Sequence, residues 1–113
     1  MKYYNEHMED IQIAYIGGGS RGWAWTFMTD LAMEPAISGT IRLYDIDRGA
    51  AKSNEIIGNA VTERQSTPGK WRYCVKDSLA DALAGADFVV ISILPGTFDE
   101  METDVHLPER LGI

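Results

Sequence analysis

The feature that most constrains how this chain folds is a cluster of glycines placed directly after a short apolar run. The run Ile11–Ile16 has the character of a buried parallel strand. It is followed by Gly17–Gly22, whose sequence GGGSRG has the spacing G-x-G-x-x-G, and then by a helical pattern from about Ser20 to Met33. A strand, a glycine turn and a helix in this order form the context in which this spacing binds the pyrophosphate of a dinucleotide.

The rest of the chain alternates between predicted strands and predicted helices. The expected elements are a strand at Ile41–Asp45 after a Ser38–Gly39 turn, a helix from Asp47 to about Gln65, a strand at Trp71–Val75, a short helix at Ser78–Ala84, a strand at Asp87–Ile93 and a helix at Phe98–Leu111. This alternation predicts an α/β fold, in which a Rossmann-type parallel sheet carries helices on both faces. The expected strand order, counting these four strands along the chain, is 3-2-1-4.

The expected domain organisation is a polar tail over residues 1–10 and an incomplete NAD-binding domain over residues 11–113. The strand at Asp87–Ile93 contains FVVISI, whose β-branched residues are typical of a central strand. The order 3-2-1-4 nevertheless leaves this strand at an edge of the sheet, where so apolar a strand is unfavourable. We therefore expect the 113 residues to be the N-terminal part of a longer protein.

Each glycine of the turn has an expected role in holding a dinucleotide. Gly17 permits the tight turn, Gly19 lets the pyrophosphate approach the backbone, and Gly22 lets the helix pack closely on the strand. The helix N-terminus offers free N–H groups and a positive dipole end, to which Ser20 adds a hydroxyl donor. A plain glycine-rich turn without a ligand is the alternative.

An acidic residue at the end of the second strand strengthens the dinucleotide hypothesis. Asp45 lies 23 positions after Gly22 (45 − 22), close to the roughly 20 positions expected for the carboxylate that accepts the ribose hydroxyls. A carboxylate there repels a 2′-phosphate, which favours NAD over NADP, although Arg48 could reduce that preference. Asp47 is the competing acidic candidate, but we expect it to be the N-cap of the second helix.

Composition excludes several classes of function. The net charge of −7 argues against nucleic-acid binding, because a phosphate backbone requires a basic surface. No apolar run is long enough to span a bilayer, and the acidic N-terminus does not resemble a signal peptide. Cys74 is the only cysteine and is expected to be a free buried thiol, which fits a cytoplasmic location.

The remaining conspicuous side chains are given structural or solvent-exposed roles. Trp23 and Trp25 are each expected in the core by default, although one of them could face a substrate or partner. His7 is expected in the tail and His106 on the last helix, neither with a catalytic role. The acidic cluster Asp99, Glu100, Glu102 and Asp104 is expected to be a solvated helix face and not a metal site.

Three segments together resemble glycoside hydrolase family 4, most closely its bacterial α-galacturonidase branch. These segments are GGGSRGWAW, LYDID, and ADFVVISILPGTFDEM with the following LPERLGI, and the resemblance covers about Ile11 to Ile113. It implies an NAD- and Mn²⁺-dependent hydrolase that cleaves α-glycosides by redox-assisted elimination, outside the usual two-carboxylate scheme. In that mechanism NAD takes a hydride from the sugar and later returns it, and a tyrosine acts as base.

The resemblance also implies which residues bind the cofactor. These residues are Gly17, Gly19, Ser20, Gly22, Asp45, Ser92 and Leu94. The family's metal-binding Cys and His and its tyrosine base are expected after Ile113, so no catalytic or metal-ligating residue is assigned here and the chain alone is expected to be inactive. Met101 stands where phosphoglycosidase members carry a substrate-contacting arginine, which implies an unphosphorylated sugar substrate, such as an α-galacturonide. The full-length protein is expected to be a homo-oligomer.

Two other functions remain open at this point. A malate- or lactate-type 2-hydroxy-acid dehydrogenase shares this fold, but such enzymes grip their substrate with loop arginines. Between Arg72 and Arg110 this chain has no arginine, and its only lysine there is Lys76. The other alternative is a non-catalytic NAD-binding module.

Overall fold

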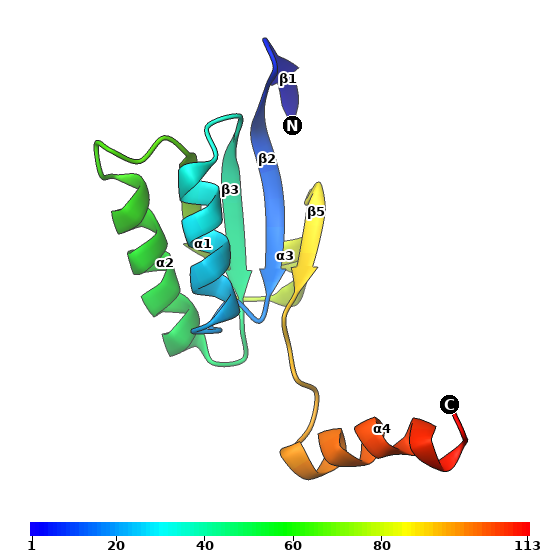
Figure 1. Cartoon of the computed structure of the whole chain (residues 1–113). Coiled ribbons are helices and arrows are strands. Elements are labelled where there is room, and N and C mark those ends of the chain that lie inside the picture. The colour runs from blue at the N-terminus through cyan, green and yellow to red at the C-terminus, as the bar shows by residue number, and fades with distance from the viewer.

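The structure is a computed structural model that describes residues 1–113, and it contains five strands and four helices (Figure 1). The strands are β1 (Lys2–Tyr4), β2 (His7–Ile16), β3 (Ile37–Tyr44), β4 (Lys70–Val75) and β5 (Phe88–Ile91), and the helices are α1 (Trp23–Met33), α2 (Arg48–Thr62), α3 (Leu79–Leu83) and α4 (Phe98–Arg110). Every predicted helix and strand is present. The observed ends differ from the predicted ends by no more than four residues. None of the helices is long and apolar enough to cross a membrane.

Four parallel strands form the sheet in the order β4-β3-β2-β5. This is the order predicted from the sequence, and the Rossmann-type fold is confirmed. Figure 1 shows α1 and α2 on one face of the sheet and α3 on the other. The arrangement follows from right-handed crossovers, because the chain moves one way from β2 to β4 and then returns past β2 to reach β5.

The hydrophobic core lies between the β2-β3-β4 part of the sheet and the helices α1 and α2. Its strand residues alternate along each strand, as side chains on one face of a sheet must. They are Ile11, Ile13 and Tyr15 of β2, Ile41 and Leu43 of β3, and Trp71 and Tyr73 of β4, and they pack with Ala24, Met28 and Leu31 of α1 and Ala51 of α2. The Tyr15 ring lies 5.5 Å from the Phe27 ring, centroid to centroid, which joins β2 to α1.

The first ten residues form a hairpin, where the sequence suggested only a polar tail. β1 pairs antiparallel with the start of β2, and Tyr4 lies opposite His7. The two residues of the turn, Asn5 and Glu6, both have positive φ angles of 48° and 64°, which is the requirement of a two-residue type I′ turn. The sequence does not indicate this hairpin, because Asn-Glu lacks the glycine that usually marks such turns.

Gly39 lies inside β3, and the prediction that Ser38–Gly39 forms a turn before the strand is wrong. The pairing of β2 with β3 shifts register between Met8 and Ile11, where Asp10 has a φ of 58°. A β-carbon on Gly39 would lie 2.0 Å from the carbonyl oxygen of Ile11. The glycine therefore serves the close approach of two backbones beside a bulge, which is a recognised reason for a glycine within a strand.

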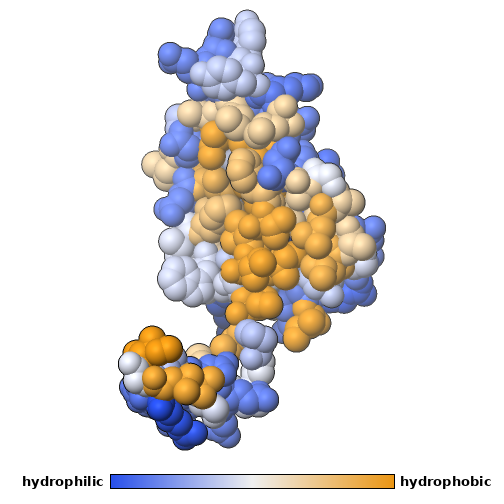
Figure 2. Space-filling model, turned by 90° about the vertical axis from the view of Figure 1, so that its right-hand side faces the viewer, coloured by the Kyte–Doolittle hydropathy of each residue, from blue (hydrophilic) through white to orange (hydrophobic).

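β5 is an edge strand that pairs with β2 alone, over four residues. Its side chains Phe88, Val89 and Ile91 are 51%, 49% and 69% exposed. Figure 2, which looks onto this edge, shows hydrophobic side chains gathered over it. α4 extends away from the sheet and buries none of its residues (Figure 1). The expectation of an apolar strand at the sheet edge is confirmed.

We expect this 113-residue chain, on its own, to self-associate through β5, because an exposed apolar edge is a template for strand pairing. Val89→Lys should shift size-exclusion chromatography toward a monomer, since a lysine on an edge strand opposes pairing. Ile56→Lys is the matched control, because Ile56 is an exposed apolar residue of α2 away from the edge. A monodisperse monomer with sharp near-UV circular dichroism for the unmodified chain would contradict this prediction.

Glu55 ties α2 to the end of β4. Its carboxylate accepts the N–H of Val75 at 2.9 Å and the Lys52 ammonium at 2.6 Å. Partial burial acts to raise the pKa of Glu55, but the hydrogen bonds from Lys52 and Val75, together with the charges of Lys52 and Arg72, outweigh it. The pKa of Glu55 is therefore held below its ordinary value of 4.5.

Because the folded-state pKa is lowered, this link stabilises the protein above the ordinary pKa and weakens as the pH falls through the lower folded value. We expect the Val75 amide in the full-length protein to lose protection from hydrogen exchange as the pH falls below the ordinary Glu55 pKa of 4.5, by roughly 1 kcal/mol. Glu55→Gln should remove this pH dependence, after correction for the intrinsic exchange rate. Equal pH dependence in both proteins would show that the carboxylate does not make the link.

Candidate nucleotide-binding site

The glycine turn joins the ends of three strands. Gly17 follows β2 directly, and the N–H groups of Gly17 and Gly18 donate to the carbonyl of Tyr44, at the end of β3, at 2.9 and 3.0 Å. Gly17 has a φ of 91°, and a β-carbon there would lie 1.9 Å from the carbonyl oxygen of Ser92, just beyond β5. Two separate constraints therefore require glycine at this position: the positive φ angle and the lack of space for a side chain. This agrees with the tight-turn role expected of Gly17.

The close-packing role expected of Gly22 is instead filled by Gly18 and Gly19. A β-carbon on Gly18 would lie 2.8 Å from the Leu43 side chain, and one on Gly19 would lie 2.8 Å from the β-carbon of Ala50 and 2.9 Å from an Asp45 oxygen. Nothing lies within 4 Å of the corresponding position on Gly22. The expected role of Gly22 is thus wrong. Gly19 must lack a side chain because it packs directly against Ala50 and Asp45.

Asp45 braces the turn from the end of β3. One carboxylate oxygen accepts the N–H of Gly19 at 2.8 Å, and the other accepts the N–H of Asp47 at 2.9 Å. An ionised carboxylate has about four acceptor positions, so two positions remain for a ligand. The structure thus brings Asp45 and the glycine turn together through a direct hydrogen bond.

The neighbours of Asp45 serve α2. Asp47 is the N-cap of this helix, and its side chain accepts the N–H of Ala50 at 3.0 Å. This confirms the N-cap role predicted for it. The guanidinium of Arg48 donates to the carboxylate and the backbone carbonyl of Asp77 at 2.7 and 2.9 Å. Arg48 is thereby directed toward the segment that follows β4.

The N-terminus of α1 is open to an anion. Gly22 is its N-cap and provides no side-chain cap, and the first turn contains no acidic residue. The first N–H groups of a helix have no intrahelical acceptors and carry the positive end of the dipole. Since the space beside Gly22 is empty, these donors are accessible from outside the protein. The arrangement suits a phosphate group.

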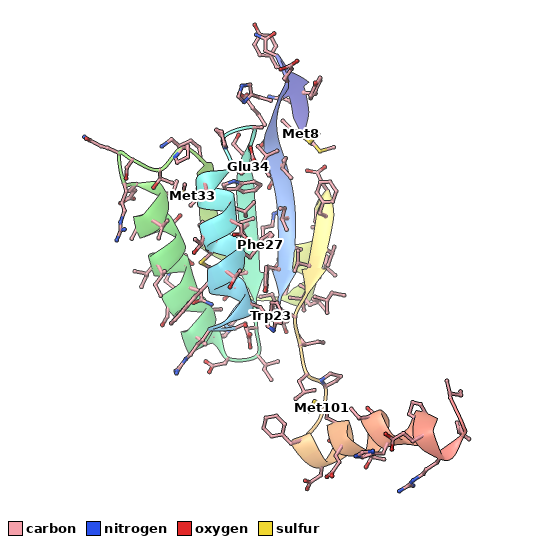
Figure 3. The ribbon with its side chains drawn as sticks, in the orientation of Figure 1. Met8, Trp23, Phe27, Met33, Glu34 and Met101 are labelled. Atoms are coloured by element: carbon pink, nitrogen blue, oxygen red, sulfur yellow. The ribbon has the colours of Figure 1, made fainter.

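A cavity of about 790 Å³ lies between α1 and β5, beside the glycine turn. Its walls include three of the residues predicted for the site, Ser20, Ser92 and Leu94, together with the apolar side chains of Tyr15, Trp23, Phe27, Val90, Ile91 and Ile93 and the polar Thr26 and Asp30. Figure 3 shows Trp23 on the first turn of α1 and Phe27 one turn further along. The volume is within the range of about 300–1,000 Å³ that small-molecule sites occupy.

Neither tryptophan of α1 belongs to the core, which corrects the default expectation for both. Trp23 is 76% exposed and Trp25 is 46% exposed. Their positions follow from the helix, because Ala24, Met28 and Leu31 take its buried face. Trp23 instead contributes to the cavity wall, which fits the alternative that one of the two faces a ligand region.

Asn54 of α2 is the site residue that sequence analysis missed. Its side chain is among the largest fully buried ones, and it contacts both the glycine turn and Trp25. The available signal was its position on the buried stripe of α2, three residues after Ala51 and four before Gly58. A polar residue on such a stripe must find hydrogen-bond partners inside the protein.

Other candidate residues lie away from this site or have ordinary structural partners. Residues 1–113 contain no group of three or more His, Cys, Asp or Glu side chains placed to hold a metal ion. Cys74 is half-buried, where full burial was expected. Glu100, one member of the acidic cluster, forms a capping box with Thr97 at the start of α4. His106 pairs with Glu109 at 2.9 Å on the same helix.

Comparison with known proteins places this geometry in a family. The sequence model described as "Family 4 glycosyl hydrolase" matches residues 12–113. An alpha-galacturonidase of Lachnoclostridium phytofermentans is 72% identical over 113 residues, which are 100% of this chain and 24% of that protein. An alpha-galacturonidase of Thermoanaerobacterium saccharolyticum is 65% identical, again over 100% of this chain and 24% of that protein. This chain thus spans about a quarter of the length of these relatives.

Two solved structures share the fold of this chain. The crystal structure of a Bacillus subtilis protein named as the glucosidase lplD matches with a TM-score of 0.73 and 55% identity, over 94% of this chain and 23% of that one. The 6-phospho-beta glucosidase of Thermotoga maritima, solved with NAD and glucose-6-phosphate, shares the fold with a TM-score of 0.62 and 24% identity, over 95% of this chain and 24% of that one. Because the family match spans nearly the whole sequence, this chain belongs to the family 4 glycosyl hydrolases.

Proposed function

We propose that this chain is the NAD-binding part of an α-galacturonidase. The observation that carries the proposal is the brace between Asp45 and Gly19, which fixes a glycine turn at the carboxyl ends of the parallel strands. In open parallel sheets, ligands bind outside these strand ends, where the order of strands reverses. Here that point lies between the neighbouring strands β2 and β5.

The residues present fit a dinucleotide in three respects. The open N-terminus of α1 and the empty space beside Gly22 suit the pyrophosphate. The free acceptor positions of Asp45 suit the hydroxyls of the adenosine ribose. Ser92 and Leu94, at the mouth of β5 in the wall of the cavity, suit the nicotinamide half. As the family resemblance implies, we also assign Gly17, Gly19 and Ser20 to the site, because they form the turn itself.

When bound, NAD supplies a hydride acceptor for the sugar and returns the hydride later, so the overall reaction is a hydrolysis. The role of residues 1–113 is to bind the cofactor and to orient it. Asp45 and the glycine turn fix the adenosine and pyrophosphate ends, which determines where the opposite end of the cofactor reaches. We place the Mn²⁺ ligands and the tyrosine base outside residues 1–113, as the family resemblance implies.

The proposed substrate is an unphosphorylated α-galacturonide. One observation and one implication of the family resemblance support it. The relatives that match the whole chain at 65% and 72% identity are named alpha-galacturonidases. The resemblance implies that Met101 stands where phosphate-recognising members carry an arginine, and a thioether cannot bind a phosphate as a guanidinium does. Membership of family 4 removes the reason for the dehydrogenase alternative.

We further infer that the full-length protein is cytoplasmic and forms an oligomer of complete chains. A single cysteine, Cys74, and the absence of any disulfide fit a reducing compartment. The exposed apolar edge at β5 must be covered in the full-length protein, by the rest of the same chain or by another chain.

The full-length protein should bind NAD more tightly than NADP, because the Asp45 carboxylate attracts ribose hydroxyls and repels a 2′-phosphate. Asp45→Ala should weaken NAD binding by roughly tenfold, as expected for losing a hydrogen bond to a charged group, and should narrow the difference between the cofactors. Titration calorimetry with both cofactors measures this. Asp47→Ala is the matched control: it should lower helix stability but preserve the NAD preference. If Asp47→Ala removed the preference instead, the assignment to Asp45 would be wrong.

The test of the proposed function is the cofactor and substrate requirement of the full-length protein. We expect it to hydrolyse an unphosphorylated α-galacturonide only with NAD, to lose activity on chelation and to regain it with Mn²⁺. Residues 1–113 alone should be inactive under the same conditions. Activity without nicotinamide cofactor, or a clear preference for a 6-phosphoglycoside, would refute the proposal.

A further inference from the structure

A buried amide connects α2, the glycine turn and α1. The Asn54 side chain is 2% exposed. Its Nδ2 donates to the carbonyls of Gly18 and Ser20 at 2.7 and 2.9 Å, and its Oδ1 accepts the indole N–H of Trp25 at 2.8 Å. Both amide hydrogens and the amide oxygen are therefore used, and each partner belongs to the turn or to the helix that follows it.

Asn54 and Asp45 hold the same peptide unit from opposite sides. The unit between Gly18 and Gly19 presents its carbonyl to Asn54 and its N–H to Asp45. Because the C=O and N–H of a trans peptide point in opposite directions, two such partners fix the plane of the unit. The orientation of the turn thus depends on α2 as well as on the end of β3.

The second carbonyl determines where the next N–H points. When the Ser20 carbonyl turns inward to Asn54, the N–H of Arg21 in the same peptide unit must point outward. That N–H has no acceptor within the protein, and it lies beside Gly22 at the open start of α1. Asn54 therefore directs a backbone donor toward the space in which an anion would bind.

Trp25 determines which of its two flipped orientations the Asn54 side-chain amide adopts. An indole N–H can only donate, so it requires the amide oxygen and leaves Nδ2 on the side of the turn. The reversed amide would place its oxygen against two carbonyl oxygens, which is repulsive. Since the Trp25 side chain is 46% exposed, its hydrogen bond can be removed with little loss of core packing.

We propose that Asn54 is a positioning residue of the NAD site, oriented by Trp25, and that together they hold the glycine turn in the shape that receives the pyrophosphate. The proposal rests on the proposed function for its ligand. It assigns no contact with the cofactor to either side chain, because both act through the backbone of Gly18–Arg21.

The experiment compares three variants of the full-length protein. Trp25→Phe removes the indole donor while keeping an aromatic ring, and Asn54→Ala removes the whole link. Asn59→Ala is the matched control, because Asn59 is a partly buried asparagine of the same helix whose amide bonds the backbone N–H and carbonyl of Tyr73 in β4, away from the turn. The measurements are NAD affinity by titration calorimetry, thermal stability, and amide hydrogen exchange over residues 17–22 without cofactor.

We expect Asn54→Ala to lower NAD affinity by roughly tenfold or more and Trp25→Phe to lower it by about threefold to tenfold, with faster exchange over residues 17–22 in both. The double variant should lose no more affinity than Asn54→Ala alone, since the two residues form one unit. Asn59→Ala should lower the melting temperature and leave NAD affinity within about twofold of the unmodified protein.

The proposal is overturned if the folded Trp25→Phe and Asn54→Ala proteins bind NAD like the unmodified one, or if Asn59→Ala loses as much affinity as they do. Should Asn54→Ala fail to fold, Trp25→Phe alone decides. If the unmodified protein does not bind NAD, the proposed function fails, and hydrogen exchange then tests the positioning role separately. Unchanged protection of residues 17–22 in Trp25→Phe and Asn54→Ala refutes that role. Loss of protection confined to residues 17–22 supports it.

Discussion

The hydrogen bond from the Gly19 N–H to the Asp45 carboxylate is the contact on which the site depends, because it joins the segment after β2 to the segment after β3. Parallel strands bring their carboxyl ends to one edge of the sheet, but they do not fix the loops that follow. Here the loops are fixed to one another. The glycine turn donates hydrogen bonds to the Tyr44 carbonyl and the Asp45 carboxylate. Asp45 also orders the start of α2 by accepting the N–H of Asp47.

Packing explains why this contact can be so well defined. The core is concentrated between β2, β3, β4 and the two helices α1 and α2, which are the elements that support the turn. Buried side chains in a close-packed interior have few alternative positions. The opposite part of the molecule is different, since β5 pairs with one strand and α4 buries none of its residues. The cavity wall formed by β5 therefore rests on fewer contacts than the turn beside it.

The parts of the fold and site that could be predicted are those encoded locally. The glycine spacing, the carboxylate at the end of β3 and the N-cap Asp47 lie within short segments whose residue types directly indicate their conformation. Asn54 could not be predicted in the same way, because its partners lie 36 and 34 residues away and become neighbours only after α2 packs beside α1.

Two other differences have the same origin. A glycine in a turn and a glycine at a close backbone contact look alike in a sequence, and Gly39 was assigned to the wrong class. The contact that distinguishes them is with Ile11, on another strand. The burial of Trp23 and Trp25 likewise depends on how α1 rotates against the sheet. The identity of these residues does not determine that rotation.

The order of the strands has a consequence for how the molecule assembles during synthesis. The support of the glycine turn comes from residues up to Cys74 and Val75, which close the β3–β4 pairing. β5 must return past these elements to pair residue 88 with residue 13, so its pairing closes a longer loop than the pairing of β2 with β3 and carries a higher entropic cost. On a chain emerging from the ribosome, the turn can therefore take its shape while β5 is still inside the exit tunnel. The wall formed by β5 can therefore be added to a glycine turn that is already formed.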